Sequence, residues 1–121
     1  MNLRLSLYKR ISSAASLEDV QAVEDEARDR FGPPPASLLH LCQVGRIKFL
    51  AQKLKIQAVD RVDDRLVLKF LPSTSVQLQR MTALLNRYAG SLTPQGVMTL
   101  SFKARNDDAF LAETIAALKE L

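Results

Sequence analysis

The sequence predicts an α+β fold, in which a small antiparallel or mixed three-stranded sheet is packed with about five helices. Two observations lead to this prediction. Apolar residues recur at helical spacing as far as about residue 55, and from Ile56 onward they alternate in short stretches bounded by turn residues. We therefore expect a single domain over residues 1–121, with a helical part at about 1–55 and a β-β-α-β-α part at about 56–121.

The first two helices are expected at residues 3–13 and Leu17–Phe31. Ser16 is a good N-cap for the second helix, because a serine before a helix accepts a hydrogen bond from a free backbone N–H group. Gly32 suits the left-handed residue at which helices end, and Pro33–Pro35 prevent continuation.

A third helix is expected over residues 36–55, which are apolar around most of the helical circumference. This pattern is typical of a central helix. Gly45 lies inside it, where glycine costs about 1 kcal/mol relative to alanine. We therefore expect another element to pack closely against Gly45.

A β-hairpin is expected next, because residues 56–62 and 65–72 read as strands on either side of an Asp63–Asp64 turn. Side chains alternate between the two faces of a strand, so one face of the second strand is apolar. That face carries Leu66, Leu68 and Phe70.

The last part of the chain reads as helix, strand and helix. Residues 75–90 are expected to form a helix with Ser75 as its cap and Gly90 at its end. Residues 97–104 alternate as a third strand, and residues 106–121 form a final amphipathic helix. The inward residues of the third strand are Met98, Leu100 and Phe102.

The composition is that of a globular domain that keeps its cysteine reduced. The chain has a formal net charge of +4, and its basic residues are scattered, which permits nucleic-acid binding without demanding it. Cys42 is the single cysteine, so no internal disulfide forms, and we expect a buried thiol in a cytoplasmic protein. No run is apolar for long enough to span a membrane. We also expect the chain to be a monomer.

Nothing in the sequence resembles a catalytic, metal or cofactor site. His40 is the single histidine and lies among leucines without a neighbouring nucleophile, so a structural role is expected. One histidine and one cysteine two positions apart do not make a metal site. Glycine-rich nucleotide-binding motifs are absent as well. We expect no enzyme activity and no cofactor in this chain.

The helix at residues 17–31 concentrates acid on one face. On a helical wheel, one face is apolar and is expected to point into the core: Leu17, Val20, Val23, Ala27 and Phe31. The opposite face carries Glu18, Ala22, Asp25, Glu26 and Asp29.

The charge spacing on this helix is not the most stabilising one. Glu24–Arg28 and Glu26–Arg30 are favourable pairs four residues apart, whereas Asp25 and Asp29 repel each other at the same spacing. The acidic face is therefore either a solvated surface or a docking surface for a basic partner.

A third interpretation makes the domain a nucleic-acid-binding module. It would use the hairpin and the basic residues of the 46–55 helix, which are Arg46, Lys48, Lys53 and Lys55.

Three motifs resemble those of a known family. They are Y-K-R-I at residues 8–11, E-x-x-D-R-F-G-x-x-P at residues 26–35, and R-x-K…A-x-K-L-x-I at residues 46–56. In this order and spacing they resemble the C-terminal domain of the bacterial transcription-repair coupling factors (Mfd, TRCF). The family usually has glycine where this chain has Lys55, and beyond Pro72 the resemblance rests on the order of elements.

The resemblance implies a function that the residues alone do not give. Members of the family are large cytoplasmic ATP-dependent DNA translocases that displace stalled RNA polymerase and recruit the repair protein UvrA. Their last domain docks on a UvrB-like N-terminal module of the same protein. This docking masks the UvrA-binding surface and restrains the motor, so the domain is autoinhibitory.

The resemblance also assigns roles to individual residues. By motif match, Glu26 and Asp29 would contact arginines of the UvrB-like module. Arg30, Phe31 and Gly32 would be structural, as an ion-pair partner, a core anchor and a helix cap. These assignments favour the docking interpretation of the acidic face.

Overall fold

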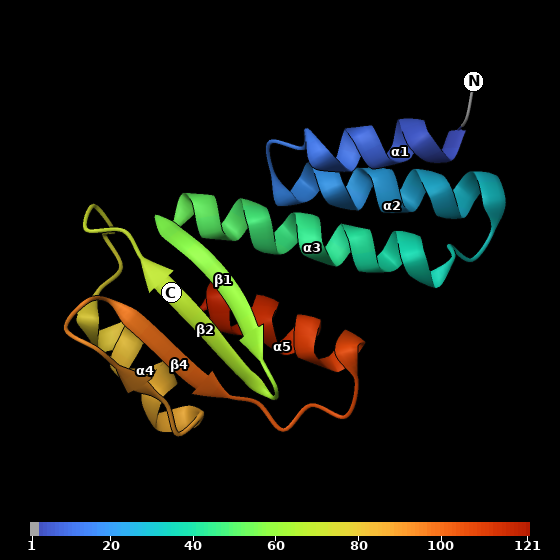
Figure 1. Cartoon of the computed structure of the whole chain (residues 1–121). Helices are drawn as coiled ribbons and strands as arrows, with labels where there is room; N and C mark the ends of the chain where they lie inside the picture. Colours follow the sequence, from blue (N-terminus) through green and yellow to red (C-terminus); the bar gives the residue numbers. More distant parts are fainter. Residues whose placement is uncertain (1–2) are drawn as a thin grey trace. The chain divides into compact units, whose positions relative to one another are not determined.

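The computed structural model describes residues 3–121 of the chain (Figure 1). They form two compact units, one ending at Phe49 and the other beginning at Leu50. The elements are α1 (Leu3–Ser12), α2 (Leu17–Phe31), α3 (Ala36–Lys53), β1 (Ile56–Val62), β2 (Arg65–Phe70), α4 (Leu78–Arg87), β3 (Ser91–Leu92), β4 (Val97–Ser101) and α5 (Asp107–Lys119). The predicted α+β class and the five helices are confirmed within these residues.

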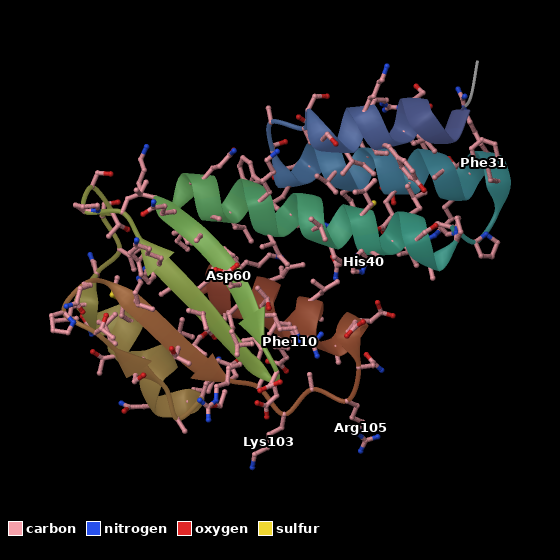
Figure 2. All side chains as sticks on the ribbon, viewed as in Figure 1. Phe31, His40, Asp60, Lys103, Arg105 and Phe110 are labelled. Atoms are coloured by element: carbon pink, nitrogen blue, oxygen red, sulfur yellow. The ribbon has the colours of Figure 1, made fainter. Side chains whose placement is uncertain are left out.

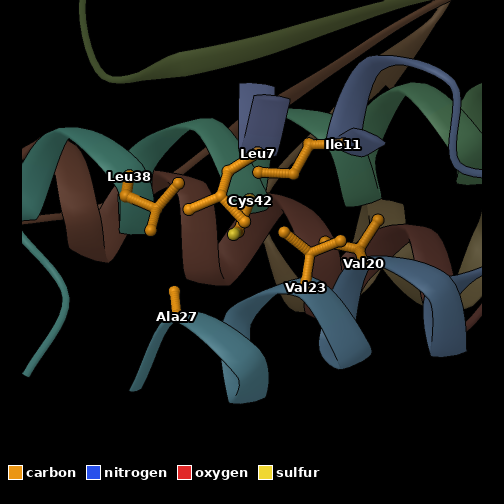
Figure 3. Close-up of a cluster of buried hydrophobic side chains, with 7 residues drawn as sticks. All are labelled: Leu7, Ile11, Val20, Val23, Ala27, Leu38 and Cys42. Carbon is orange, nitrogen blue, oxygen red and sulfur yellow. The ribbon is translucent and has the colours of Figure 1, made fainter. Parts of the chain in front are cut away.

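The first unit is built from α1, α2 and most of α3. Its core is a cluster of buried side chains drawn from all three helices (Figure 3). The cluster comprises Leu7, Ile11, Val20, Val23, Ala27, Leu38 and Cys42. Gly45 on α3 faces this cluster, and a methyl group added there would lie 2.9 Å from Cγ2 of Ile11. The predicted close packing at Gly45 is confirmed.

Both predicted ends of α2 are confirmed. The Ser16 hydroxyl accepts a hydrogen bond from the Asp19 N–H at 3.1 Å, and Asp19 in turn accepts one from the Ala15 N–H at 3.0 Å. At the other end Gly32 has φ +76, which is a conformation that favours glycine. Its N–H donates to the carbonyl of Arg28 at 3.0 Å.

Phe31 does not anchor the core, contrary to the prediction. Its side chain is 53% exposed, while Ala27, one turn earlier on the same face, is 2% exposed. The reason is that Phe31 is the last residue of α2 and stands next to the turn, where the packed core of the unit has already ended. A helical wheel shows which side of a helix a residue is on, but not where the neighbouring helices stop.

The second unit contains a four-stranded antiparallel sheet in the order β1-β2-β4-β3. The prediction of three strands was therefore one strand short. The missing strand, β3, has two residues, and it pairs Ser91 with Thr99 and Leu92 with Met98. A strand this short has no alternation that a sequence pattern can reveal.

Helices α4 and α5 lie behind the sheet in the view of Figure 1. The inward residues predicted for β2 and β4 are buried, and Phe102 is 1% exposed just after β4. Its ring contacts those of Tyr88 and Phe110 edge to face, with centroids 4.9 and 5.2 Å apart. These contacts join the ends of α4 and β4 to α5.

Helix α4 is shorter than predicted. It begins at Leu78, with Gln77 at the cap position and no capping side chain, so Ser75 is not its cap. The preceding segment is held elsewhere, because the Thr74 hydroxyl donates to the carbonyl of Leu54 at 2.7 Å. Gly90 lies beyond the helix end, and a methyl group there would come within 2.4 Å of the Thr99 carbonyl oxygen.

Candidate functional site

The exposed face of α2 carries most of the acid that the sequence predicted there. Glu18, Ala22, Asp25 and Asp29 are all exposed. Asp25 accepts a hydrogen bond from the Gln21 amide at 3.0 Å. Among the side chains that the structure describes, no cation forms an ion pair with Glu18, Asp25 or Asp29. We call these three residues the acidic face.

Glu26 is placed differently from the other predicted docking residues. Its carboxylate is bound by Arg10 of α1 and lies 3.4 Å from Arg30, as predicted for the pair four residues apart. The side chain is 31% exposed. The hydrogen bond from Arg10 is the main cause that lowers the pKa of Glu26. A basic partner would therefore have to share Glu26 with two arginines of this chain.

Arg46 is not part of a solvated basic face. Its guanidinium donates to Gln43 at 2.7 Å, to Gln21 at 2.8 Å and to Glu24 at 3.3 Å, and the side chain is 14% exposed. Glu24 also lies 3.8 Å from Arg28, as the spacing predicted. Arg46 therefore ties α3 to α2, and the exposed cations left in the predicted basic run are Lys48, Lys53 and Lys55.

Two of the three residues expected to be structural, Arg30 and Gly32, have the predicted roles, and Phe31 does not. Arg30 is an ion-pair partner of Glu26, and Gly32 closes α2, as the resemblance implied. Phe31 instead lines the wall of an apolar pocket of about 290 Å³ at the end of the first unit. The pocket is lined by Leu7, Tyr8, Ala27, Phe31, Pro34, Pro35 and Leu38. This pocket was not predicted, although an aromatic residue separated by one glycine from three prolines was its visible signal.

The second unit has a pocket of its own, of about 560 Å³, between the end of α4, the segment after β4 and α5. Its charged side chains are mixed, with Arg87, Lys103 and Arg105 on one hand and Glu113 on the other. Figure 2 shows Lys103 and Arg105 pointing away from the helices and the sheet. The Tyr88 hydroxyl donates a hydrogen bond to Glu113 at 3.0 Å. The pKa of Tyr88 is raised, mainly because the side chain is partly buried.

The single histidine and the single cysteine lie in different surroundings. His40 is exposed, and Cys42 is fully buried, which raises the pKa of its thiol. No group of three metal-binding side chains is found among the described residues. In the same part of the chain, none of the helices combines the length and the apolar character that crossing a membrane requires.

Residues 1–81 match the protein family described as the TRCF domain. The chain belongs to this family. The TRCF domain thus covers α1 to the beginning of α4, and so includes the whole acidic face.

Full-length relatives of this TRCF domain are transcription-repair-coupling factors. The chain is 31% identical to that of Rickettsia typhi over 72% of its own length and 8% of the relative. It is 30% identical to that of Escherichia coli over 84% of its length, and 26% identical to that of Bacillus subtilis over 98%. These matches cover 9% and 11% of the relatives, so the chain spans about a tenth of them.

A solved structure has the same fold. It is the crystal structure of the C-terminal domain of a transcription-repair coupling factor, with a TM-score of 0.82 over 99% of this chain and 79% of that chain. The sequence identity is 19%. The chain thus belongs to the TRCF family and has the fold of that C-terminal domain, as the sequence motifs indicated.

Proposed function

We propose that this TRCF domain is a regulatory docking module of a transcription-repair coupling factor. The observation that carries the proposal is the acidic face, whose three carboxylates are exposed and have no cation partner among the described side chains. Carboxylates in this state attract a basic partner and steer its approach. The domain would act by binding alone, without a cofactor and without catalysis.

The partner that we propose is the UvrB-like N-terminal module of the same protein. Docking there would mask the UvrA-binding surface and restrain the DNA translocase until RNA polymerase is engaged. The whole protein would then work in the cytoplasm, displacing stalled polymerase in transcription-coupled repair with ATP hydrolysis in other domains. In this chain Asp29 and Asp25 would carry the docking, and Glu26 would contribute only by sharing its carboxylate.

A reversible latch fits the strength of these interactions. Exposed ion pairs contribute about 1 kcal/mol or less each, so two or three of them break readily. Tethering within one polypeptide raises the effective concentration, so weak contacts still hold the domain in place. A surface that bound more tightly would be a poor autoinhibitory switch.

The experiment is a calorimetric titration of this chain with the UvrB-like module. The Asp25→Lys/Asp29→Lys variant should bind at least about tenfold more weakly, which corresponds to about 1.4 kcal/mol. Asp60→Lys/Asp64→Lys is the matched control, because it makes the same change in net charge at two exposed acids of the second unit and should leave binding unchanged. Equal losses in both variants would point to net charge rather than to the acidic face, and no loss in either would reject the proposal.

Nucleic-acid binding by the basic residues of α3 is the competing proposal, but Arg46 is not free to take part in it. Lys48, Lys53 and Lys55 are exposed and able to meet phosphates, but Arg46 is occupied by α2. Binding of duplex DNA that falls steeply with salt, and that is lost when Lys48 and Lys53 are changed to glutamine, would support this interpretation.

A further inference from the structure

The pocket at the end of the first unit exposes an aromatic ring that the domain itself does not cover. Phe31 is 53% exposed, and it stands beside Pro34, Pro35 and Tyr8 on the pocket wall. A volume of about 290 Å³ is at the lower end of the range for small-molecule sites, about 300 Å³ and more. This size suits one or two large side chains of a polypeptide.

Two arginines stand on either side of this pocket. Ala27 and Phe31 line the pocket from α2, and residues of a helix follow one another at about 100°. Arg28 and Arg30 therefore project to the two flanks of the Ala27–Phe31 row. Their ion pairs confirm these directions, because Arg30 shares Glu26 with Arg10 of α1, and Arg28 shares Glu24 with Arg46 of α3.

These flanks carry an excess of positive charge. Two carboxylates, those of Glu24 and Glu26, are shared among four guanidinium groups, those of Arg10, Arg28, Arg30 and Arg46. Arg46 and Arg10 make the closer contacts, so Arg28 and Arg30 are left incompletely neutralised, and both are more than half exposed. Asp25 and Asp29 lie on the opposite side of α2 and point away from the pocket.

We propose that the pocket is a second docking site, which takes an acidic polypeptide segment with a large apolar side chain. The apolar side chain would enter the pocket against Phe31, and flanking carboxylates of the segment would pair with Arg28 and Arg30. Charge complementarity and the apolar lining of the pocket together favour this occupant. A nucleic acid could also pair with the arginines, but a base that entered this apolar lining would leave its polar edge without hydrogen-bond partners. The pocket thus binds an acidic partner, whereas the acidic face binds a basic one. The pocket proposal does not depend on the proposed docking of the acidic face.

The test uses the ¹⁵N-labelled chain and three short synthetic peptides. The first carries a leucine–phenylalanine pair between glutamates, the second has lysine in place of each glutamate, and the third has alanine in place of the apolar pair. The first peptide should shift the backbone amide signals of Leu7, Tyr8, Phe31 and Leu38. The second and third peptides should bind about tenfold more weakly or not at all.

Substitutions in the chain then identify the site. Arg28→Glu/Arg30→Glu should reverse the preference in favour of the lysine peptide, since Glu24 and Glu26 keep Arg46 and Arg10 as partners. Phe31→Ser should weaken the first peptide and remain folded, because the ring is largely exposed. Asp25→Lys/Asp29→Lys should leave this binding unchanged and so separates this site from the latch.

Three results would overturn the proposal. The first is that the acidic peptide shifts no pocket amide at millimolar concentration. The second is that the lysine peptide binds the unaltered chain as tightly as the acidic one does. The third is that binding survives Phe31→Ser unchanged, and this variant serves as the test if the double arginine variant fails to fold.

Discussion

Replacing Arg46 with methionine tests whether this arginine is a structural tie or part of a basic surface. Methionine keeps an unbranched apolar stem that reaches about as far as Nε of arginine, and it removes the guanidinium. The substitution breaks the hydrogen bonds to Gln43 and Gln21 and the ion pair with Glu24. Glu24 is 12% exposed, and its carboxylate would keep one cation, Arg28 at 3.8 Å, and a hydrogen bond from the Gln21 amide at 3.4 Å.

The expected loss of stability follows from this partial burial. An exposed ion pair contributes about 1 kcal/mol or less, whereas removing one partner of a fully buried pair costs about 3–5 kcal/mol. Arg46 and Glu24, at 14% and 12% exposure, lie between these limits. We therefore expect Arg46→Met to lower the free energy of unfolding by about 2 kcal/mol, or the Tm by about 8 °C for a chain of this size.

The assay is thermal and urea unfolding followed by circular dichroism, with Lys48→Met as the matched control. Lys48 lies on the same helix but is exposed, so its substitution should change stability by less than about 0.5 kcal/mol. If the two variants differ from the unaltered chain by the same amount, Arg46 does not tie α2 to α3.

Further predictions concern the same unit. Gly45→Ala should be destabilising by about 1–2 kcal/mol in urea unfolding, because the clash with Ile11 outweighs the gain in helix propensity; a more stable variant would contradict the close contact. The unaltered chain should be more stable than Glu26→Gln above pH 4.5, because the Glu26 carboxylate is then ionised and paired with Arg10. This difference in the free energy of unfolding should disappear as the pH falls through the lowered pKa of Glu26. A difference that persists at acid pH would argue against the pair with Arg10. Cys42 should react with a thiol reagent only on unfolding, so fast reaction of the folded chain would show that it is not buried.

The elements were predictable where the sequence carries a local signal. Helix α2 has a capping serine, an apolar row and a glycine stop, and each acts through contacts within a few residues. Strand β2 alternates cleanly because one of its faces is buried. Strand β3 has two residues and no local signal, and it exists because β4 offers a free edge.

The parts of the site that the sequence did not give depend on contacts between distant residues. Arg10 binds Glu26 across 16 positions, and Arg46 binds Glu24 across 22. Helical spacing along one segment cannot reveal either pair. For the same reason a helical wheel placed Phe31 in the core, although its ring is 53% exposed at the last position of α2.

A charge-reversal rescue between this domain and the UvrB-like module tests whether the acidic face is the docking surface. Asp29→Lys in this chain should weaken binding, and glutamate in place of an arginine of the module that faces it should restore binding with the variant. The same module variant should bind the unaltered chain more weakly. Rescue would establish the acidic face as the docking surface. Losses that simply add in the double variant would contradict the account, because the two side chains would then not be in contact.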